Sequence, residues 1–268
     1  MRRTFGLTAI LLLIAAPAPG QVRLESDFDC DRIGTHDDRE TWCEIREETL
    51  AGGNPLDVDA GPNGGIRVRG WDRGEILVRA RVVGTAETEE EARRLVAGVR
   101  VDTGGGQVRA QGPEAVGGRR DGHWHVSYEI MAPQNAQLAL NTRNGGISVR
   151  DLRGTVRFRA RNGGIRLENV GGEFRGETTN GGVTVDLSGD RWDGSGLDVE
   201  TRNGGIRLDL PANYSAELET GTTNGRVNID FPVTVQGRIG RHLTTTLGAG
   251  GPRIRAMTTN GGVRIRRR

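Results

Sequence analysis

Apolar and polar residues alternate in short runs through the second half of the chain, and Asn-Gly turns separate the runs. In the stretch TVRFRARNGGIRLENV, Val156, Phe158 and Ala160 alternate with arginines before the turn. After the turn, Ile165 and Leu167 alternate with charged residues. A period of two places one face of a β-strand in the core and the other in solvent. The pattern predicts an all-β protein made of half-buried strands.

The turns between these strands repeat the motif Asn-Gly at a regular interval. The motif begins at seven positions: Asn63, Asn144, Asn162, Asn180, Asn203, Asn224 and Asn260. From Asn144 the steps are 18, 18, 23, 21 and 36 residues. A fixed interval is the signature of a repeat architecture. It predicts a parallel β-helix-like solenoid with coils of about 18 residues, in which the step of 36 residues reflects one lost turn.

The solenoid makes a specific prediction about the asparagines. Equivalent residues of successive coils should lie roughly 4.8 Å apart, so the seven side chains should form a hydrogen-bonded ladder along the stack. Glycine would supply the tight corner that a Cβ blocks. The alternative is an antiparallel meander of Asn-Gly hairpins, because Asn-Gly is also a strong hairpin signal. A meander gives no reason for the regular interval, which favours the solenoid.

The pattern divides the chain into four parts. We expect a signal peptide over residues 1–20, a disulfide-pinned segment over 21–50, an irregular β region over 51–140 and regular coils over 141–268. The irregular region includes the segment TAETEEEARRLVAGV, which predicts a helical insert over 86–98. Thr85 or Thr88 can cap this helix, and acidic residues crowd its first turn.

The beginning of the chain predicts an exported protein. MRRTFGLTAILLLIAAPAPG combines two arginines, an apolar stretch too short to span a bilayer, and small residues at its end. We therefore expect the mature protein to lie in the periplasm or at the cell surface, with no membrane span. Cys30 and Cys43 are the only cysteines, and in an oxidising compartment they are expected to form a disulfide.

Composition narrows the choice of partner. Hydrophobic residues make up 34% of the chain and aromatic residues 4%, while 43 residues are glycine, which is typical of a thin-cored, turn-rich β protein. The basic residues are all arginines, yet the net charge is only +2. A nucleic-acid partner is therefore not expected from charge.

The sequence offers weak candidates for metal binding and none for catalysis. Asp27, Asp29 and Asp31 have the alternate spacing of a calcium loop, but Arg32 stands where that loop requires glycine. His123 and His125 share a strand face, but the sequence identifies no third ligand. We therefore expect no metal, no cofactor and no catalytic residues.

Several motifs together resemble a known family. VDAGPNGGIRVRGWDR, WHVSYEI, WDGSGLDVETRNGGI, YSAELETGTTNGRVNIDFP and GAGGPRIRAMTTNGGVRI occur in this order and resemble the bacterial DUF4097 family, whose members are called "putative adhesins". The resemblance covers residues 40–268. It implies a β-strand-repeat, solenoid-like fold at the cell envelope, and it assigns no ligand or functional residue. The Asn224 turn departs from the pattern because it lacks the second glycine.

These observations predict an exported, non-enzymatic envelope protein that presents a polar strand face to a glycan or protein partner. The candidate binding residues are Arg157, Arg159, Arg166, Arg175 and Arg207. Two other functions stay open: a carbohydrate-active enzyme on a β-helix scaffold, and a structural protein that assembles with copies of itself.

Overall fold

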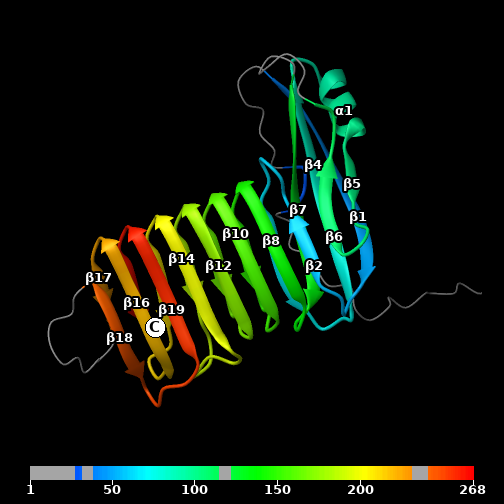
Figure 1. Cartoon of the computed structure of the whole chain (residues 1–268). Helices are drawn as coiled ribbons and strands as arrows, with labels where there is room; N and C mark the ends of the chain where they lie inside the picture. The colour runs from blue at the N-terminus through cyan, green and yellow to red at the C-terminus, as the bar shows by residue number, and fades with distance from the viewer. Residues whose placement is uncertain (1–27, 32–38, 115–121, 231–240) are drawn as a thin grey trace, which may run out of the picture.

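The structure is a computed structural model that describes residues 28–31, 39–114, 122–230 and 241–268. In these ranges it contains twenty strands and one helix, so the prediction of an all-β fold is confirmed (Figure 1). The predicted signal peptide, together with Asp27 and Arg32, lies outside the described residues.

The strands form two sheets of ten strands each. We call the first sheet A; its order is β1-β4-β7-β3-β9-β11-β13-β15-β20-β17. Its strands are β1 (Glu40–Ala51), β4 (Glu75–Ala86), β7 (His123–Pro133), β3 (Ile66–Trp71), β9 (Ile147–Arg150), β11 (Ile165–Glu168), β13 (Val183–Asp186), β15 (Ile206–Leu210), β20 (Val263–Arg267) and β17 (Val227–Ile229).

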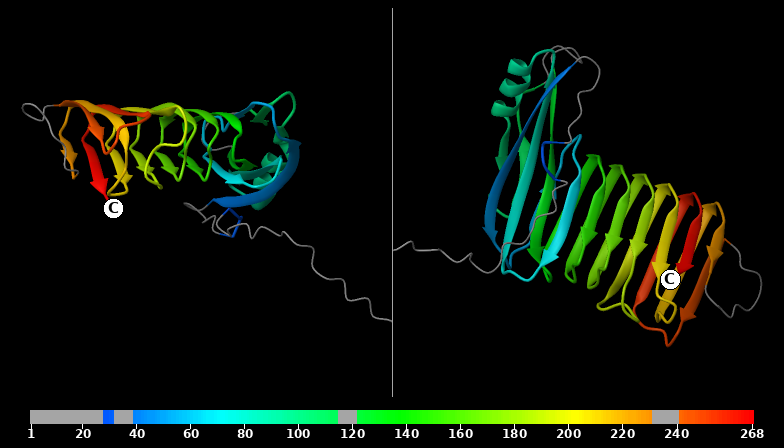
Figure 2. Two further views of the ribbon diagram at one scale, coloured as in Figure 1. Left: turned by 90° about the horizontal axis from the view of Figure 1, so that it is seen from below. Right: turned by 180° about the vertical axis from the view of Figure 1, so that it is seen from behind.

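The second sheet, sheet B, has the order β18-β16-β19-β14-β12-β10-β8-β2-β6-β5. Its strands are β18 (His242–Leu247), β16 (Ala216–Asn224), β19 (Arg253–Asn260), β14 (Gly196–Asn203), β12 (Glu173–Asn180), β10 (Thr155–Asn162), β8 (Gln137–Asn144), β2 (Leu56–Asp59), β6 (Gln107–Gln111) and β5 (Arg100–Asp102). The two sheets lie as two layers along the length of the molecule (Figure 2).

Each Asn-Gly turn carries the chain from one sheet to the other. The turn at Asn162, for example, joins β10 of sheet B to β11 of sheet A. β10 pairs in parallel with β8 and β12, and Asn162 is in register with Asn144 and Asn180. The strands that flank a turn are therefore not hairpin partners, and the meander alternative is wrong. One sheet B strand, its turn and the following sheet A strand form one coil of a solenoid-like stack.

The core is the space between the two sheets. Val156, Phe158 and Ala160 of β10 are buried, as are Ile165 and Leu167 of β11. The alternation therefore directs the apolar side chains of both strands inward, as the sequence predicts. Complete burial of one such aliphatic side chain contributes about 1.5–3 kcal/mol, and the stack repeats this contribution in every coil.

A second, buried set of hydrogen bonds supports the turns. A threonine two residues before the asparagine donates its hydroxyl to a glycine carbonyl of the neighbouring coil. The pairs are Thr142 with Gly64, Thr178 with Gly163, Thr201 with Gly181, Thr258 with Gly204 and Thr222 with Gly261, at 2.5–2.8 Å. The coil of Asn162 has Ala160 at this position.

This exception provides a matched pair of variants. Thr201→Val keeps the volume of the side chain but leaves the Gly181 carbonyl without its buried donor, so we expect it to lower the free energy of unfolding by about 1–2 kcal/mol. Ala160→Thr places a hydroxyl where five of the other six coils have one, and we expect a gain of about 0.5–1 kcal/mol. Urea unfolding followed by circular dichroism measures both; equal effects of the two variants would contradict this role.

The last coils are not stacked in the order in which they follow one another along the chain. β19 lies between β14 and β16, and β20 lies between β15 and β17. The coil of Asn260 is therefore inserted between those of Asn203 and Asn224, and the step of 36 residues does not mark a lost turn. β18 pairs antiparallel with β16 and forms the edge of sheet B.

This order explains why Arg226 replaces a glycine. A Cβ on the second glycine of a turn would approach the next coil: it would lie 3.3 Å from the Gly182 carbonyl oxygen at Gly164, and 3.3 Å from the Arg226 carbonyl oxygen at Gly262. The coil of Asn224 is the outermost one. No further coil lies beyond it among the described residues, so a side chain is tolerated at Arg226.

The N-terminal half closes the other end of the stack. β2 and β3 form the coil of Asn63, which pairs with β8 and β9; the expected irregular region therefore contributes a coil to the same stack. β1, β4 and β7 are long antiparallel strands that rise beyond the coils (Figure 1). The helix α1 (Glu89–Gly98) packs on them, and Thr88 caps it with a capping box.

Candidate functional site

The seven asparagines lie in one column. Each side chain between the two ends donates its Nδ2 to the Oδ1 of one neighbour and accepts from the other, at 2.7–3.0 Å. The order along the column is Asn63, Asn144, Asn162, Asn180, Asn203, Asn260 and Asn224. All seven side chains use their amide groups to join coils, which makes the column a structural element and not an open binding site.

Cys30 and Cys43 form the expected disulfide, with their Cα atoms 5.7 Å apart. Cys43 belongs to β1, so the bond fixes the short segment 28–31 beside sheet A. Phe28 is buried, and the guanidinium groups of Arg79 and Arg81 lie 5.7 and 4.8 Å from its ring centroid. The disulfide therefore holds an aromatic ring against the arginines at one end of the sheet.

The five candidate arginines do not share one face. Arg157, Arg159 and Arg175 lie on sheet B. Arg166 and Arg207 lie on sheet A. The reason is that the first three precede an Asn-Gly turn and the other two follow one, and the turn changes the sheet. The two outer faces must therefore be considered separately.

On sheet B the charges of both signs are interleaved. Arg157 is in register with Arg175, which is in register with Asp198. Arg255 lies 2.7 Å from Asp198, and Arg159 lies 2.8 Å from Glu177. This face has a hollow of about 490 Å³ beside Gly176. The charged side chains named above line it. Acidic side chains on the sheet B face therefore neutralise much of the positive charge of its arginines.

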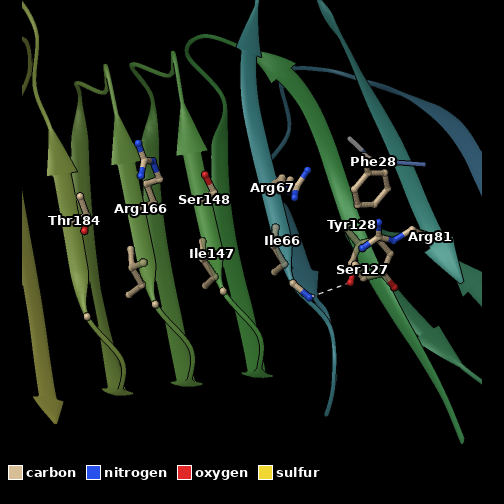
Figure 3. A pocket seen from close by; sticks show the side chains of 15 residues that line it. Phe28, Ile66, Arg67, Arg81, Ser127, Tyr128, Ile147, Ser148, Arg166 and Thr184 are labelled. Atoms are coloured by element: carbon tan, nitrogen blue, oxygen red, sulfur yellow. Dashed lines mark hydrogen bonds between the residues drawn. The ribbon is translucent and has the colours of Figure 1, made fainter. Parts of the chain in front are cut away.

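Sheet A has a furrow of about 550 Å³ that runs across successive coils (Figure 3). We call it the glycine furrow; Phe28, Gly65, Ile66, Arg67, Arg81, Ser127, Tyr128, Gly146, Ile147, Ser148, Gly164, Ile165, Arg166, Gly182 and Thr184 line it. Its floor is the column of second glycines of the Asn-Gly-Gly turns. Because these positions lack side chains, the outer row of the sheet is hollow there.

A row of arginines and hydroxyls forms one wall of the glycine furrow with its first four members and continues beyond the furrow with two more arginines. In register across the coils stand Arg67, Ser148, Arg166, Thr184, Arg207 and Arg264. We call this set the arginine row; it contains no acidic residue. Figure 3 displays its first four members side by side on successive strands. Acidic residues two positions further along the same strands partly neutralise these arginines. Arg166 lies 3.5 Å from Glu168, and Arg207 lies 3.3 Å from Asp209.

The furrow ends at β7 and β4. Ser127 accepts a hydrogen bond of 3.2 Å from the Gly65 amide, and Arg81 stands beside it under the Phe28 ring (Figure 3). Burial, followed by the charge of Arg67, lowers the pKa of Arg81 below its ordinary value. The Nε of Arg81 is buried and has no hydrogen-bond partner among the described residues. The carboxylates of Asp29 and Glu129 act on the Arg81 pKa in the opposite direction. The fold thus brings two cations together beside two acids and leaves one buried donor unsatisfied.

The candidate metal ligands among the described residues do not line this furrow. Burial lowers the pKa of His125, and the charges of His123 and Arg81 act in the same direction, so His125 is neutral at neutral pH. Within the described ranges, no group of three or more His, Cys, Asp or Glu side chains is placed to hold a metal ion. The main-chain oxygen of Asp29 accepts a hydrogen bond of 3.2 Å from Arg81 Nη1.

Sequence reasoning missed most of the furrow. It identified Arg166 and Arg207, but not Arg67, Arg81, Ser127 or Phe28. A usable signal was present: Arg67, Ser148, Arg166, Thr184, Arg207 and Arg264 all occupy the fourth position after the asparagine of an Asn-Gly-Gly turn. Phe28 and Arg81 had no comparable signal, because the disulfide and the antiparallel strands position them.

Comparisons with solved structures give weak likenesses. A "putative cell adhesion protein" from Clostridium sporogenes has 13% sequence identity and a TM-score of 0.41, covering 84% of this chain and 100% of its own. A "putative adhesin" from Bacteroides fragilis has 11% identity and a TM-score of 0.37, covering 84% and 97%. A "putative lipid binding protein" from Parabacteroides distasonis has 12% identity and a TM-score of 0.36, covering 84% and 96%.

No curated protein matches the chain. In the described ranges, no helix combines the length and apolar character needed to cross a membrane. The family model Toastrack DUF4097 matches residues 88–266, more than half of the chain. These residues include α1 and every coil except that of Asn63. The resemblance read from the motifs is confirmed, and the chain belongs to the Toastrack DUF4097 family.

Proposed function

We propose that this protein is an exported, non-enzymatic envelope protein on a β-solenoid scaffold, and that its glycine furrow binds a linear anionic polymer, in particular an acidic envelope glycan. The observation that carries this proposal is the pairing of a side-chain-free floor with the arginine row. The floor lets a polymer chain approach the backbone closely, and the row supplies a cation at every second coil from Arg67 to Arg207.

The spacing of the cations favours an extended ligand over a small one. Arg67, Arg166 and Arg207 alternate with Ser148 and Thr184 along the row. Neighbouring coils are roughly 4.8 Å apart, so these guanidinium groups recur roughly every 9.6 Å. In a linear uronic-acid glycan the carboxylates of every second sugar recur with a comparable regularity, and the intervening hydroxyl side chains can hydrogen-bond to the sugars between them.

The closed end of the furrow offers an anchoring point for one anionic group. Arg81 and Arg67 repel each other there, and the buried Nε of Arg81 is a donor without an acceptor. A carboxylate relieves both costs at once, because buried cations and donors are stabilised by a charged acceptor. Phe28 restricts access of water on one side.

The first experiment is a binding titration of the purified, oxidised protein with fluorescent oligogalacturonate, followed by anisotropy at low ionic strength. We expect saturable binding that weakens as salt is added. Dextran of equal length should not bind, and single-stranded DNA of equal charge should bind more weakly. Absence of oligogalacturonate binding at low salt would sink the acidic-glycan proposal.

Two charge-matched variants locate the binding face. Arg166→Gln removes one cation from the furrow, and we expect it to weaken oligogalacturonate binding about fivefold. Arg157→Gln makes the same change on sheet B, and we expect it to leave the affinity within about twofold. Equal losses in both variants would mean that binding depends only on total charge.

A further inference from the structure

The Asn-Gly pairs raise a chemical question, because Asn-Gly is the dipeptide most prone to spontaneous deamidation. In this reaction the glycine nitrogen attacks the asparagine Cγ, ammonia leaves and a succinimide forms. Water then opens the ring to aspartate or isoaspartate. The reaction requires a free glycine N–H and a side chain that can turn toward it. The structure differs among the seven sites in both respects.

Five of the seven sites are blocked by the stack. The N–H of the following glycine donates to the main-chain oxygen of the asparagine in the neighbouring coil, at 2.9–3.1 Å. The donors are Gly145, Gly163, Gly181, Gly204 and Gly261. At these sites the asparagine side chain is also held by both of its neighbours in the column. Attack on Cγ therefore requires local opening of the coil.

The two ends of the column differ from each other. Gly64 follows Asn63 and is buried, and a Cβ on it would lie 1.9 Å from the Val126 oxygen, so this end is packed against β7. Gly225 follows Asn224 and is exposed. The N–H of Gly225, like that of Gly64, has no acceptor among the described residues. The two ends differ in exposure, since Gly64 is buried and Gly225 is exposed where no further coil is stacked.

Asn224, like Asn63 at the other end, is held by only one hydrogen bond of the column. Its Nδ2 donates to Asn260 Oδ1 at 2.8 Å. Its own Oδ1 accepts no bond from any described residue, since it is the last member of the column. A single hydrogen bond must break for Cγ to turn toward the Gly225 nitrogen.

We propose that Asn224–Gly225 is a deamidation site, the one Asn-Gly pair of the column that converts in the folded protein. The product replaces the Nδ2 donor with a carboxylate oxygen that faces Asn260 Oδ1, so the outermost bond of the column is lost. Isoaspartate also adds a main-chain atom between β16 and β17, which shifts the register of the outer coil. This modification acts on the C-terminal end of the stack, away from the closed end of the glycine furrow.

The test is peptide mapping by mass spectrometry of the full-length oxidised protein after incubation in mildly alkaline buffer. We expect Asn224 to convert at least about tenfold faster than each of the other six asparagines, with ammonia loss and isoaspartate at that position. In denaturing urea, all seven should convert at rates within about threefold of one another, because protection by the fold is gone. Conversion of an inner asparagine at the rate of Asn224 in the folded protein would overturn the proposal, and so would equal protection of Asn224.

Discussion

Replacing Gly163 with alanine is expected to lower the free energy of unfolding by about 3 kcal/mol or more, the upper end of the effects of overpacking. A Cβ at this corner would lie 1.9 Å from the Gly145 oxygen and 2.5 Å from the Gly145 carbon, both main-chain atoms of the neighbouring coil. The coils of Asn144 and Asn162 cannot separate at this corner without stretching the Asn162–Asn144 side-chain hydrogen bond and the bond from the Gly145 N–H to the Asn162 main-chain oxygen. Urea unfolding followed by circular dichroism measures the change.

Two further alanine variants make this a graded test. A Cβ at Gly164 would lie 3.3 Å from the Gly182 oxygen, so a smaller loss is expected. A Cβ at Gly74, in the turn between β3 and β4, would meet nothing within 4 Å, and its variant should stay within about 0.5 kcal/mol of the parent. If Gly74→Ala were as costly as Gly163→Ala, close approach of the coils would not be the reason for the corner glycines.

Deleting residues 253–268 is expected to unfold more than the coil that is removed. β19 and β20 connect the outer coil to the rest of the stack, because β16 and β17 pair with them and with no earlier coil. Hydrogen exchange should therefore lose protection over residues 216–229 and 242–247 as well. The coils over residues 137–186 should keep their protection, since repeat proteins are stabilised by neighbour contacts.

A chain that ends at Arg267 serves as the control for this deletion. It retains both strands and loses only Arg268, whose guanidinium lies 2.6 Å from Asp186. We expect its exchange pattern over residues 216–229 to match that of the full chain. Retained protection of the outer coil after the larger deletion would mean that the coils can restack in chain order, contrary to the strand order of the structure.

The sequence predicted the elements of the stack because each coil repeats the same local requirements. The alternation around Asn162 predicted two half-buried strands, and the motif predicted a corner between them. The order of the last coils could not be read from spacing, since 36 residues also suits two successive coils. The informative residue was Arg226: a side chain at the second glycine position avoids a close approach to the next coil only on an outermost coil.

The candidate binding face was predicted incompletely for a different reason. Alternation indicates which side chains point outward, but not toward which side of a two-layer molecule. Arg157 and Arg166 both face solvent, yet they lie on opposite sheets because the turn at Asn162 separates them. The closed end of the furrow depends on contacts of Arg81 and Phe28 that are distant in sequence, and no local pattern encodes them.

The insertion of β19 and β20 has a consequence for the time course of folding. This segment is made after β16 and β17, yet its place is between them and the earlier coils. Until it arrives, β14 and β16 each present an unpaired edge toward an empty slot. A chain shortened before β19 therefore stays open at that slot, a state that limited proteolysis can distinguish from the complete stack.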